Sequence, residues 1–150
     1  MDKSELRDAL MQQLWRLNKL DLMVSLREFI EGELAALYYL RGCDEAVTPS
    51  QISENLRVSR ARAANILRAL REKGYVEMSI AEDDRRKMDV CLTEEGRRYC
   101  DEKYAYLVRY FDLYVDVLGE NDILELTRLL KRTADEEVLL RESEESPESE

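Results

Sequence analysis

Three side chains between residues 60 and 70 have the types and the spacing that reading DNA bases requires. Arg62, Asn65 and Arg68 follow one another at steps of three residues, and such steps keep side chains on one face of a helix. In the major groove, which is wide enough for a helix, arginine pairs with guanine and asparagine with adenine. The buried side of the same helix would carry four apolar residues: Ala63, Ile66, Leu67 and Leu70. The segment therefore has one face for a protein core and one face that could contact bases.

The formal net charge is positive only around these side chains. The chain of 150 residues carries −10 and has a pI near 4.7, which disfavours contact with a polyanion. Residues 48–100 nevertheless carry +2, and residues 59–73 alone carry +4. The remaining segments are acidic: residues 1–47 (−3), 101–140 (−5) and 141–150 (−4). A basic cluster in an acidic chain indicates a local surface for an anionic partner, although solvated arginines on a helix face remain the alternative.

The residue types that are missing exclude most catalytic and metal-binding classes. Without histidine, the chain has no Ser-His-Asp or Cys-His catalysis and no histidine metal site. Cys43, Cys91 and Cys100 lie too far apart to suggest a tetrahedral zinc site, and their odd number fits reduced thiols. We therefore expect no enzyme, no metal and no cofactor. A charged N-terminus and a longest apolar run of seven residues, 34–40, predict a soluble, cytoplasmic protein with no membrane partner.

The first forty residues predict helices. Glycine and proline are scarce, which favours a helix-rich fold. Apolar residues recur every three or four positions from Leu6 to Leu20 and continue to Ile30, partly off the same face. We expect a long first helix that is apolar on two sides and so needs two sets of neighbours. Residues 34–40 predict a short buried helix that ends near Gly42.

Start and stop signals divide the middle of the chain into two helices joined by a turn. The first start signal is a capping box with a proline at the first helical position: Thr48, Pro49 and Gln51. This helix must end near residues 57–58, and Ser59 caps a second helix that runs to Lys73. Gly74 ends that helix in the left-handed conformation. Two helices with a turn of about three residues between them are the layout of a helix-turn-helix.

A β-hairpin follows, because the apolar period changes to two residues. Two alternating runs carry it: Val76, Met78 and Ile80, then Met88, Val90 and Leu92. Residues 81–87 form its charged tip, in which a carboxylate beside an arginine could hold the guanidinium toward a minor groove. An ordinary solvated turn would have the same composition. A helix-turn-helix followed by such a hairpin is a winged helix.

Donors for DNA phosphates lie at the start of the short helix. Ser50, Gln51 and Ser53 offer backbone and side-chain donors there, and such contacts position a protein on DNA without specifying sequence. For Ser50 and Gln51, simple capping is the alternative that we favour.

The last third of the chain predicts two more helices and a tail. Thr93 caps a helix with an apolar stripe from Cys100 to Leu118, Gly119 breaks it, and Asn121 caps a final helix. Residues 141–150 are acidic, and we expect them to be disordered.

The spacing of the wing resembles that of a known family. Asp84-x-Arg86, five residues, then Leu92-Thr93-x-x-Gly96 is similar to the wing signature of the MarR family of bacterial and archaeal transcriptional regulators. The match extends upstream over residues 48–56, the Val58-Ser59 turn and Leu67-x-x-Leu70-x-x-x-Gly74-Tyr75-Val76, and into the flanking helices. The fold expected is mainly α with a β-hairpin wing.

The resemblance implies a homodimer on a pseudo-palindromic operator. It implies one domain over residues 1–140, with a DNA-binding lobe at 48–92 and dimerisation helices at 1–30 and 97–140. Together with the residue pattern, it assigns double-stranded DNA contacts to the second helix: Ser59, Arg60, Arg62, Ala64, Asn65 and Arg68. The wing contacts would be Asp84, Arg85, Arg86 and Lys87, with Asp84 orienting Arg86. A small aromatic or phenolic effector, held between the dimer helices and the lobe, would release the DNA.

Several alternatives remain open at this point. Peroxide-sensing relatives use a cysteine in the first helix, and this chain has none there, so redox sensing is not the expectation. The tyrosines could line an effector pocket or simply pack: Tyr38, Tyr39, Tyr99, Tyr104, Tyr106, Tyr110 and Tyr114. The leading hypothesis is a transcriptional regulator, with repression expected before activation. The alternative is a winged-helix module that binds a basic protein and no DNA.

Overall fold

A computed structural model describes residues 1–144 of the chain. Its elements follow one another in this order: α1 (Lys3–Asn18), α2 (Asp21–Glu28), α3 (Glu33–Arg41), α4 (Pro49–Leu56), α5 (Arg60–Glu72), β1 (Val76–Ile80), β2 (Met88–Leu92), α6 (Glu94–Leu118) and α7 (Glu120–Glu144). The fold class expected from the sequence, mainly helical with one hairpin, is confirmed. None of the helices within residues 1–144 is long and apolar enough to cross a membrane.

The chain forms two compact units, residues 1–108 and a second unit from Arg109 onward, where the sequence predicted one domain. No side chain between residues 109 and 137 is buried. Over these residues, which form the end of α6 and most of α7, the second unit therefore has no buried core of its own.

The first helix of the sequence analysis is two helices, which corrects that prediction. α1 ends at Asn18, and Leu20 is extended at φ −75° and ψ 144° before α2 begins. The Arg27 guanidinium donates to the Asn18 side chain across the break. The break allows Leu22 of α2 to be buried, whereas no residue of α1 is. No glycine or proline lies at this point, and the signals that the sequence did offer were weaker: Asn18 at the end of α1 and Asp21 at the start of α2.

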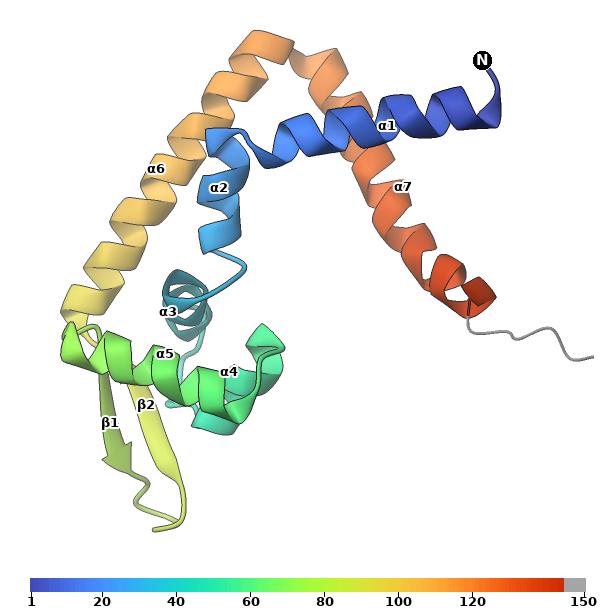
Figure 1. The fold of residues 1–150 in the computed structure, drawn as a ribbon. Coiled ribbons are helices and arrows are strands. Elements are labelled where there is room, and N and C mark those ends of the chain that lie inside the picture. The colour runs from blue at the N-terminus through green and yellow to red at the C-terminus, as the bar shows by residue number, and fades with distance from the viewer. Residues whose placement is uncertain (145–150) are drawn as a thin grey trace, which may run out of the picture. The chain divides into compact units, whose positions relative to one another are not determined.

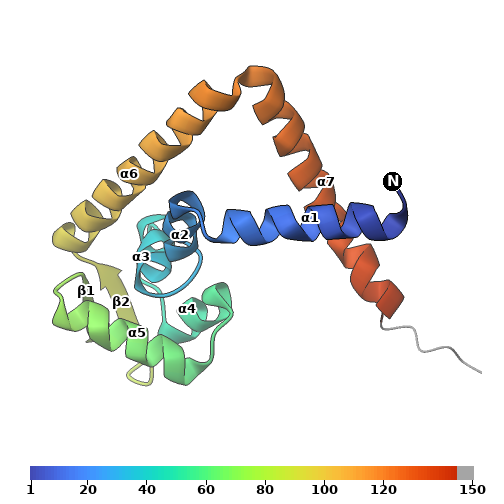
Figure 2. The same cartoon turned by 45° about the horizontal axis from the view of Figure 1, so that its top comes forward.

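The core of the first unit lies between α3, α4, α5 and the base of the hairpin. Figure 1 shows α5 lying across α4, with the hairpin extending from the end of α5. The turned view in Figure 2 shows α2 leading into α3, and these two helices pack together. The largest fully buried side chains come from five elements: Leu37, Ile52, Leu67, Leu70, Val90 and Cys100. This core fixes the helix-turn-helix against the hairpin.

The turn between α4 and α5 has an unusual backbone. Arg57 ends α4 in the left-handed region, at φ 53° and ψ 45°. Val58 N–H donates to the Ser53 carbonyl over 3.1 Å, and the Ser53 hydroxyl donates to the Val58 carbonyl over 2.9 Å. The turn is thus closed by two hydrogen bonds between the same pair of residues.

The hairpin has the predicted strands and a shorter tip. Val76 pairs with Leu92, Met78 with Val90 and Ile80 with Met88. A third segment joins it, since Val90 N–H donates to the Val47 carbonyl over 2.8 Å. Ala81 is buried, and its N–H donates to the Lys87 carbonyl over 3.0 Å. Pairing therefore continues beyond the strands, and the free tip is residues 82–86 instead of 81–87.

The last helices begin and end close to the predicted points. Gly119, at φ +81°, separates α6 from α7 as expected. Asn121 is already the second residue of α7 and does not precede it, because Gly119 supplies the change of direction. α7 continues to Glu144, with an Arg141–Glu137 ion pair of 2.9 Å in its last turns. The first residues of the expected disordered tail are therefore helical, and residues 145–150 lie outside the described part of the chain.

Candidate nucleic-acid interface

The outer face of α5 is fixed by its cap and by its buried face. The Ser59 hydroxyl accepts a hydrogen bond from Arg62 N–H over 3.1 Å. The four apolar residues predicted to face inward are all buried: Ala63, Ile66, Leu67 and Leu70. Six residues predicted to contact DNA are all exposed: Ser59, Arg60, Arg62, Ala64, Asn65 and Arg68. The helix therefore exposes the side chains predicted to contact DNA on an element that is capped and packed on its other face.

The cations on this face have no partner within the described residues. Arg60, Arg62 and Arg68 form no ion pair and lie over no aromatic ring in residues 1–144. Lys73, at the other end of α5, pairs with Glu33 over 2.7 Å. Charged groups left unpaired on a rigid surface are free to bind external anions such as phosphates.

The start of α4 contains one exposed donor and two residues that are already engaged. Gln51 N–H donates to the Thr48 hydroxyl over 3.2 Å, and the Gln51 side chain accepts from Thr48 N–H over 2.8 Å. Gln51 is therefore a capping residue. Ser53 is 8% exposed, and its hydroxyl donates to Val58, so the prediction that it contacts phosphate is wrong. Ser50 is exposed in the first turn of the helix.

The wing arginines are exposed, and Asp84 acts on the backbone. The Asp84 carboxylate accepts a hydrogen bond from Arg86 N–H over 2.9 Å and makes no ion pair with the Arg86 guanidinium. This corrects the expectation of a paired guanidinium, because a turn of this length brings the carboxylate to the N–H two residues on. Arg85, Arg86 and Lys87 are all exposed. Asp84 therefore shapes the tip that carries them.

The fold brings the wing next to the start of α4, which the sequence did not predict. A hollow of about 430 Å³ is lined from both sides, by residues 48–51 and residues 86–88. Ser50 from the helix and Arg86 and Lys87 from the wing share its wall. More than thirty residues separate these two segments in the sequence, and only the folded lobe places them together.

The tyrosines do not form one cluster. Tyr38 and Tyr104 stack with ring centroids 5.7 Å apart, and Phe29 meets the Tyr38 ring edge-on at 5.5 Å. Tyr99 instead stacks on Tyr75 at 4.6 Å. A second hollow of about 370 Å³ lies between the segment that follows α2, α3 and the end of α4, with aromatic side chains in its wall: Phe29, Tyr38 and Tyr39. Burial, followed by the neighbouring Cys43 thiol, raises the pKa of Tyr39.

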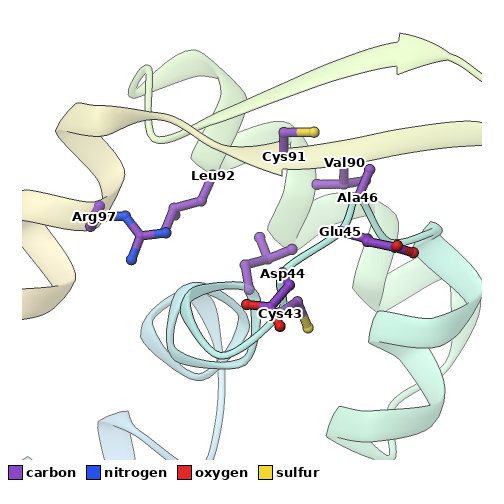
Figure 3. Close-up of a pocket in the computed structure, with 9 residues that line it drawn as sticks. Cys43, Asp44, Glu45, Ala46, Val90, Cys91, Leu92 and Arg97 are labelled. Atoms are coloured by element: carbon purple, nitrogen blue, oxygen red, sulfur yellow. The ribbon is translucent and has the colours of Figure 1, made fainter.

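The cysteines are separate free thiols. Cys43 and Cys91 line the same pocket, with Asp44, Glu45 and Arg97 around them, yet Figure 3 shows their side chains pointing away from each other. The Cys43 thiol donates to the Tyr39 carbonyl over 3.3 Å. Cys100 is fully buried, and this burial raises the pKa of its thiol.

Comparison with known proteins identifies the fold as a winged helix. A family model described as a winged helix DNA-binding domain matches residues 33–111. The HTH-type transcriptional regulator PecS of Dickeya dadantii is 31% identical over 101 residues, which cover 67% of this chain and 54% of PecS. The chain thus matches about half the length of this curated relative.

Solved structures share the fold over almost the whole chain. YusO of Bacillus subtilis has a TM-score of 0.70 at 20% identity, covering 90% of this chain and 99% of that one. FabT of Streptococcus pneumoniae, solved in complex with DNA, has a TM-score of 0.68 at 21% identity and coverages of 93% and 99%. A MarR transcriptional regulator of Methanosarcina mazei Go1 has a TM-score of 0.61 at 18% identity and coverages of 91% and 99%. The chain therefore belongs to the winged helix DNA-binding domain family, and its fold is that of the MarR transcriptional regulators.

Proposed function

We propose that the protein is a sequence-specific DNA-binding transcriptional regulator that acts by binding and not by catalysis. One observation carries the proposal: α5 is capped and packed on one face, while Arg62, Asn65 and Arg68 are exposed on the other without ion pairs. PecS, by its name, is a transcriptional regulator, and FabT has been solved with DNA. We place this activity in the cytoplasm and expect repression before activation.

The proposed DNA contacts divide into two kinds. Arg62, Asn65 and Arg68 read base edges, with Ser59, Arg60 and Ala64 in the first turns beside them. Ser50 and the wing cations line or flank the hollow between α4 and the wing, and they bind phosphate or enter the minor groove. Phosphate contacts fix the register, whereas base contacts select the sequence. Residues 48–92 are thus the DNA-binding lobe.

We also propose a homodimer formed through residues 1–30 and 97–140. α1 buries none of its side chains, and its apolar residues are open to solvent, including Leu10 at 61% and Trp15 at 66% exposed. Large exposed apolar surfaces mark interaction sites. The resemblance to the MarR family implies a homodimer, and two lobes related by a two-fold axis would match a pseudo-palindromic operator.

An aromatic or phenolic effector is proposed for the hollow lined by Phe29, Tyr38 and Tyr39. Its volume of about 370 Å³ falls in the range of roughly 300–1,000 Å³ that small ligands occupy. Phe29 and Tyr38 supply flat apolar walls, and Asn55 supplies a polar group. Because α4 is part of the DNA-binding lobe, a ligand here would move the phosphate donors relative to α5.

The effector proposal predicts that simple phenols release bound DNA. Tyr38→Ala should raise the phenol concentration needed for release at least several-fold, because the ring offers much of the contact area. A fluorescence anisotropy competition measures this, with Tyr99→Ala as the control because Tyr99 stacks on Tyr75 away from the hollow. Equal release from wild type and both variants would contradict the assignment.

The function itself is tested by selection from random DNA duplexes followed by affinity measurements at several salt concentrations. Phosphate neutralisation lowers log affinity with log salt at a slope of about −0.9 per contact. Enrichment of a two-fold-symmetric site with a steep slope supports the proposal. No enrichment and no binding to any duplex would leave the protein-interaction module as the better description.

A further inference from the structure

Arg57 has a backbone conformation that arginine adopts at a cost. Among residues 1–144, Arg57 is the one non-glycine residue with a positive φ, which is 53°. In the left-handed region the Cβ of an L-residue crowds the following carbonyl, and glycine avoids this crowding. Glycine is also the usual residue at the end of a helix in this conformation. For folding alone, glycine at position 57 would serve better.

The surrounding turn does not allow this backbone to relax. Arg57 N–H donates to the Glu54 carbonyl over 3.2 Å, and the Ser53–Val58 pair closes the turn around it. Ser59, two residues further, is already the cap of α5. The left-handed conformation is therefore required to join α4 to α5.

The Arg57 side chain returns nothing to the fold that would offset this cost. It is exposed and makes no hydrogen bond, ion pair or ring contact with any described residue, including Glu54 one turn before it. Arg60, Arg62 and Arg68 are exposed and unpaired as well, but Arg57 combines an unpaired side chain with a left-handed backbone. A strained residue whose side chain serves no internal contact points to an external one.

We infer that Arg57 binds a phosphate of the DNA backbone beside the bases that the first turn of α5 contacts. The inference rests on the proposed function. Arg57, Arg60 and Arg62 put three unpaired cations into six residues at the junction of α4 and α5. Guanidinium groups bind phosphate oxygens through paired hydrogen bonds. The residue thus lowers fold stability and raises affinity for DNA.

Arg57→Gly separates these two effects because they have opposite signs. We expect a melting temperature higher by roughly 2–4 °C, as for the relief of about 1 kcal/mol in a chain of this size. DNA affinity should fall by about three-fold to ten-fold at physiological salt, and the log–log salt slope should become shallower by about 0.9. The loss should be similar on the selected duplex and on unrelated duplexes, since a phosphate contact does not depend on sequence.

Two further variants and a control make the test specific. Arg57→Lys keeps the charge and should keep the salt slope of wild type. Arg57→Asn tolerates the left-handed backbone but lacks the charge, and its salt slope should become as shallow as that of Arg57→Gly. Arg41→Ala removes a cation that is already paired with Asp101 and lies outside both the DNA-binding lobe and the proposed dimerisation helices, so it should leave the slope unchanged.

The outcomes distinguish this inference from the proposed function. If wild type binds the selected duplex and Arg57→Gly binds it with equal affinity and slope, the phosphate contact is overturned and the regulator remains. A loss confined to the selected duplex would also overturn it, because Arg57 would then read a base. If wild type binds no duplex, both fail.

Discussion

Arg62, Asn65 and Arg68 owe their exposure to the four apolar side chains that face the other way on α5. This division was predictable, because helix periodicity determines which residues share a face. The roles of Ser53 and Asp84 were not predictable. Ser53 lies within α4 and Asp84 in the wing tip, and a sequence does not show whether such a polar side chain contacts a ligand or a nearby backbone group. Here both bind the backbone.

Ser50 and Ser53 should therefore respond in opposite ways to the same substitution. Ser53→Ala leaves the half-buried Val58 carbonyl without its side-chain donor and should lower the free energy of unfolding by about 0.5–1.5 kcal/mol. Ser50→Ala should leave stability unchanged and weaken DNA binding, because Ser50 is exposed beside the wing. Chemical denaturation and DNA titration of both variants measure this. Loss of stability in Ser50→Ala, or none in Ser53→Ala, would contradict the assignment.

Among the helices, capping residues fixed the predicted starting points. Thr48, Ser59 and Thr93 cap the helices that they were predicted to cap, because local hydrogen bonds decide where a helix starts. The break between α1 and α2 escaped prediction. It depends on the burial of Leu22, which is a tertiary effect. The proximity of the wing to α4 escaped for the same reason.

The joint between the wing and α6 depends on one glycine. The Thr93 hydroxyl donates to the Gly74 carbonyl over 2.7 Å and accepts from Gly96 N–H over 3.0 Å. A Cβ on Gly96 would overlap the Tyr75 carbonyl oxygen and lie 2.9 Å from its carbonyl carbon. Helix and wing can approach this closely only without a side chain at that position.

Gly96→Ala should accordingly destabilise the lobe by about 1–3 kcal/mol or more, because backbone atoms must move apart. Gly42→Ala is the matched control: its Cβ would lie 3.6 Å from the nearest atom, at an ordinary φ of −82°, and it should be neutral or slightly stabilising. Thermal unfolding of both proteins tests this. Equal melting temperatures would show that the joint is looser than the structure indicates.

For the whole molecule, the net charge of −10 is an average over parts with different roles. The basic residues of α5 and the wing are exposed and unpaired, whereas acidic segments make up the proposed dimerisation helices. Weak general attraction to DNA would leave more of the binding energy to sequence-dependent contacts. The charge total alone would have argued against DNA binding.

The proposed dimer predicts a mass near twice 17.6 kDa by light scattering. Placing two carboxylates in α1, as Leu10→Glu with Leu14→Glu, should shift the population toward monomer, because charges would enter an apolar interface. The lobe should remain folded, since α1 contributes no buried residue to it. Ile80→Glu, at a residue of the wing that is equally exposed at 61%, is the control and should stay dimeric. A monomeric wild type would overturn the proposed interface and the operator symmetry.

The central claim is that α5 reads DNA sequence, and the ratio of affinities for a selected and an unrelated duplex tests it most directly. Arg62→Ala should lose about 1–3 kcal/mol of binding free energy on the selected duplex, relax the preference at one base position and change little on the unrelated one. Arg71→Ala, the same change near the other end of α5, should leave the ratio near that of wild type. Equal ratios for wild type and Arg62→Ala would contradict the claim.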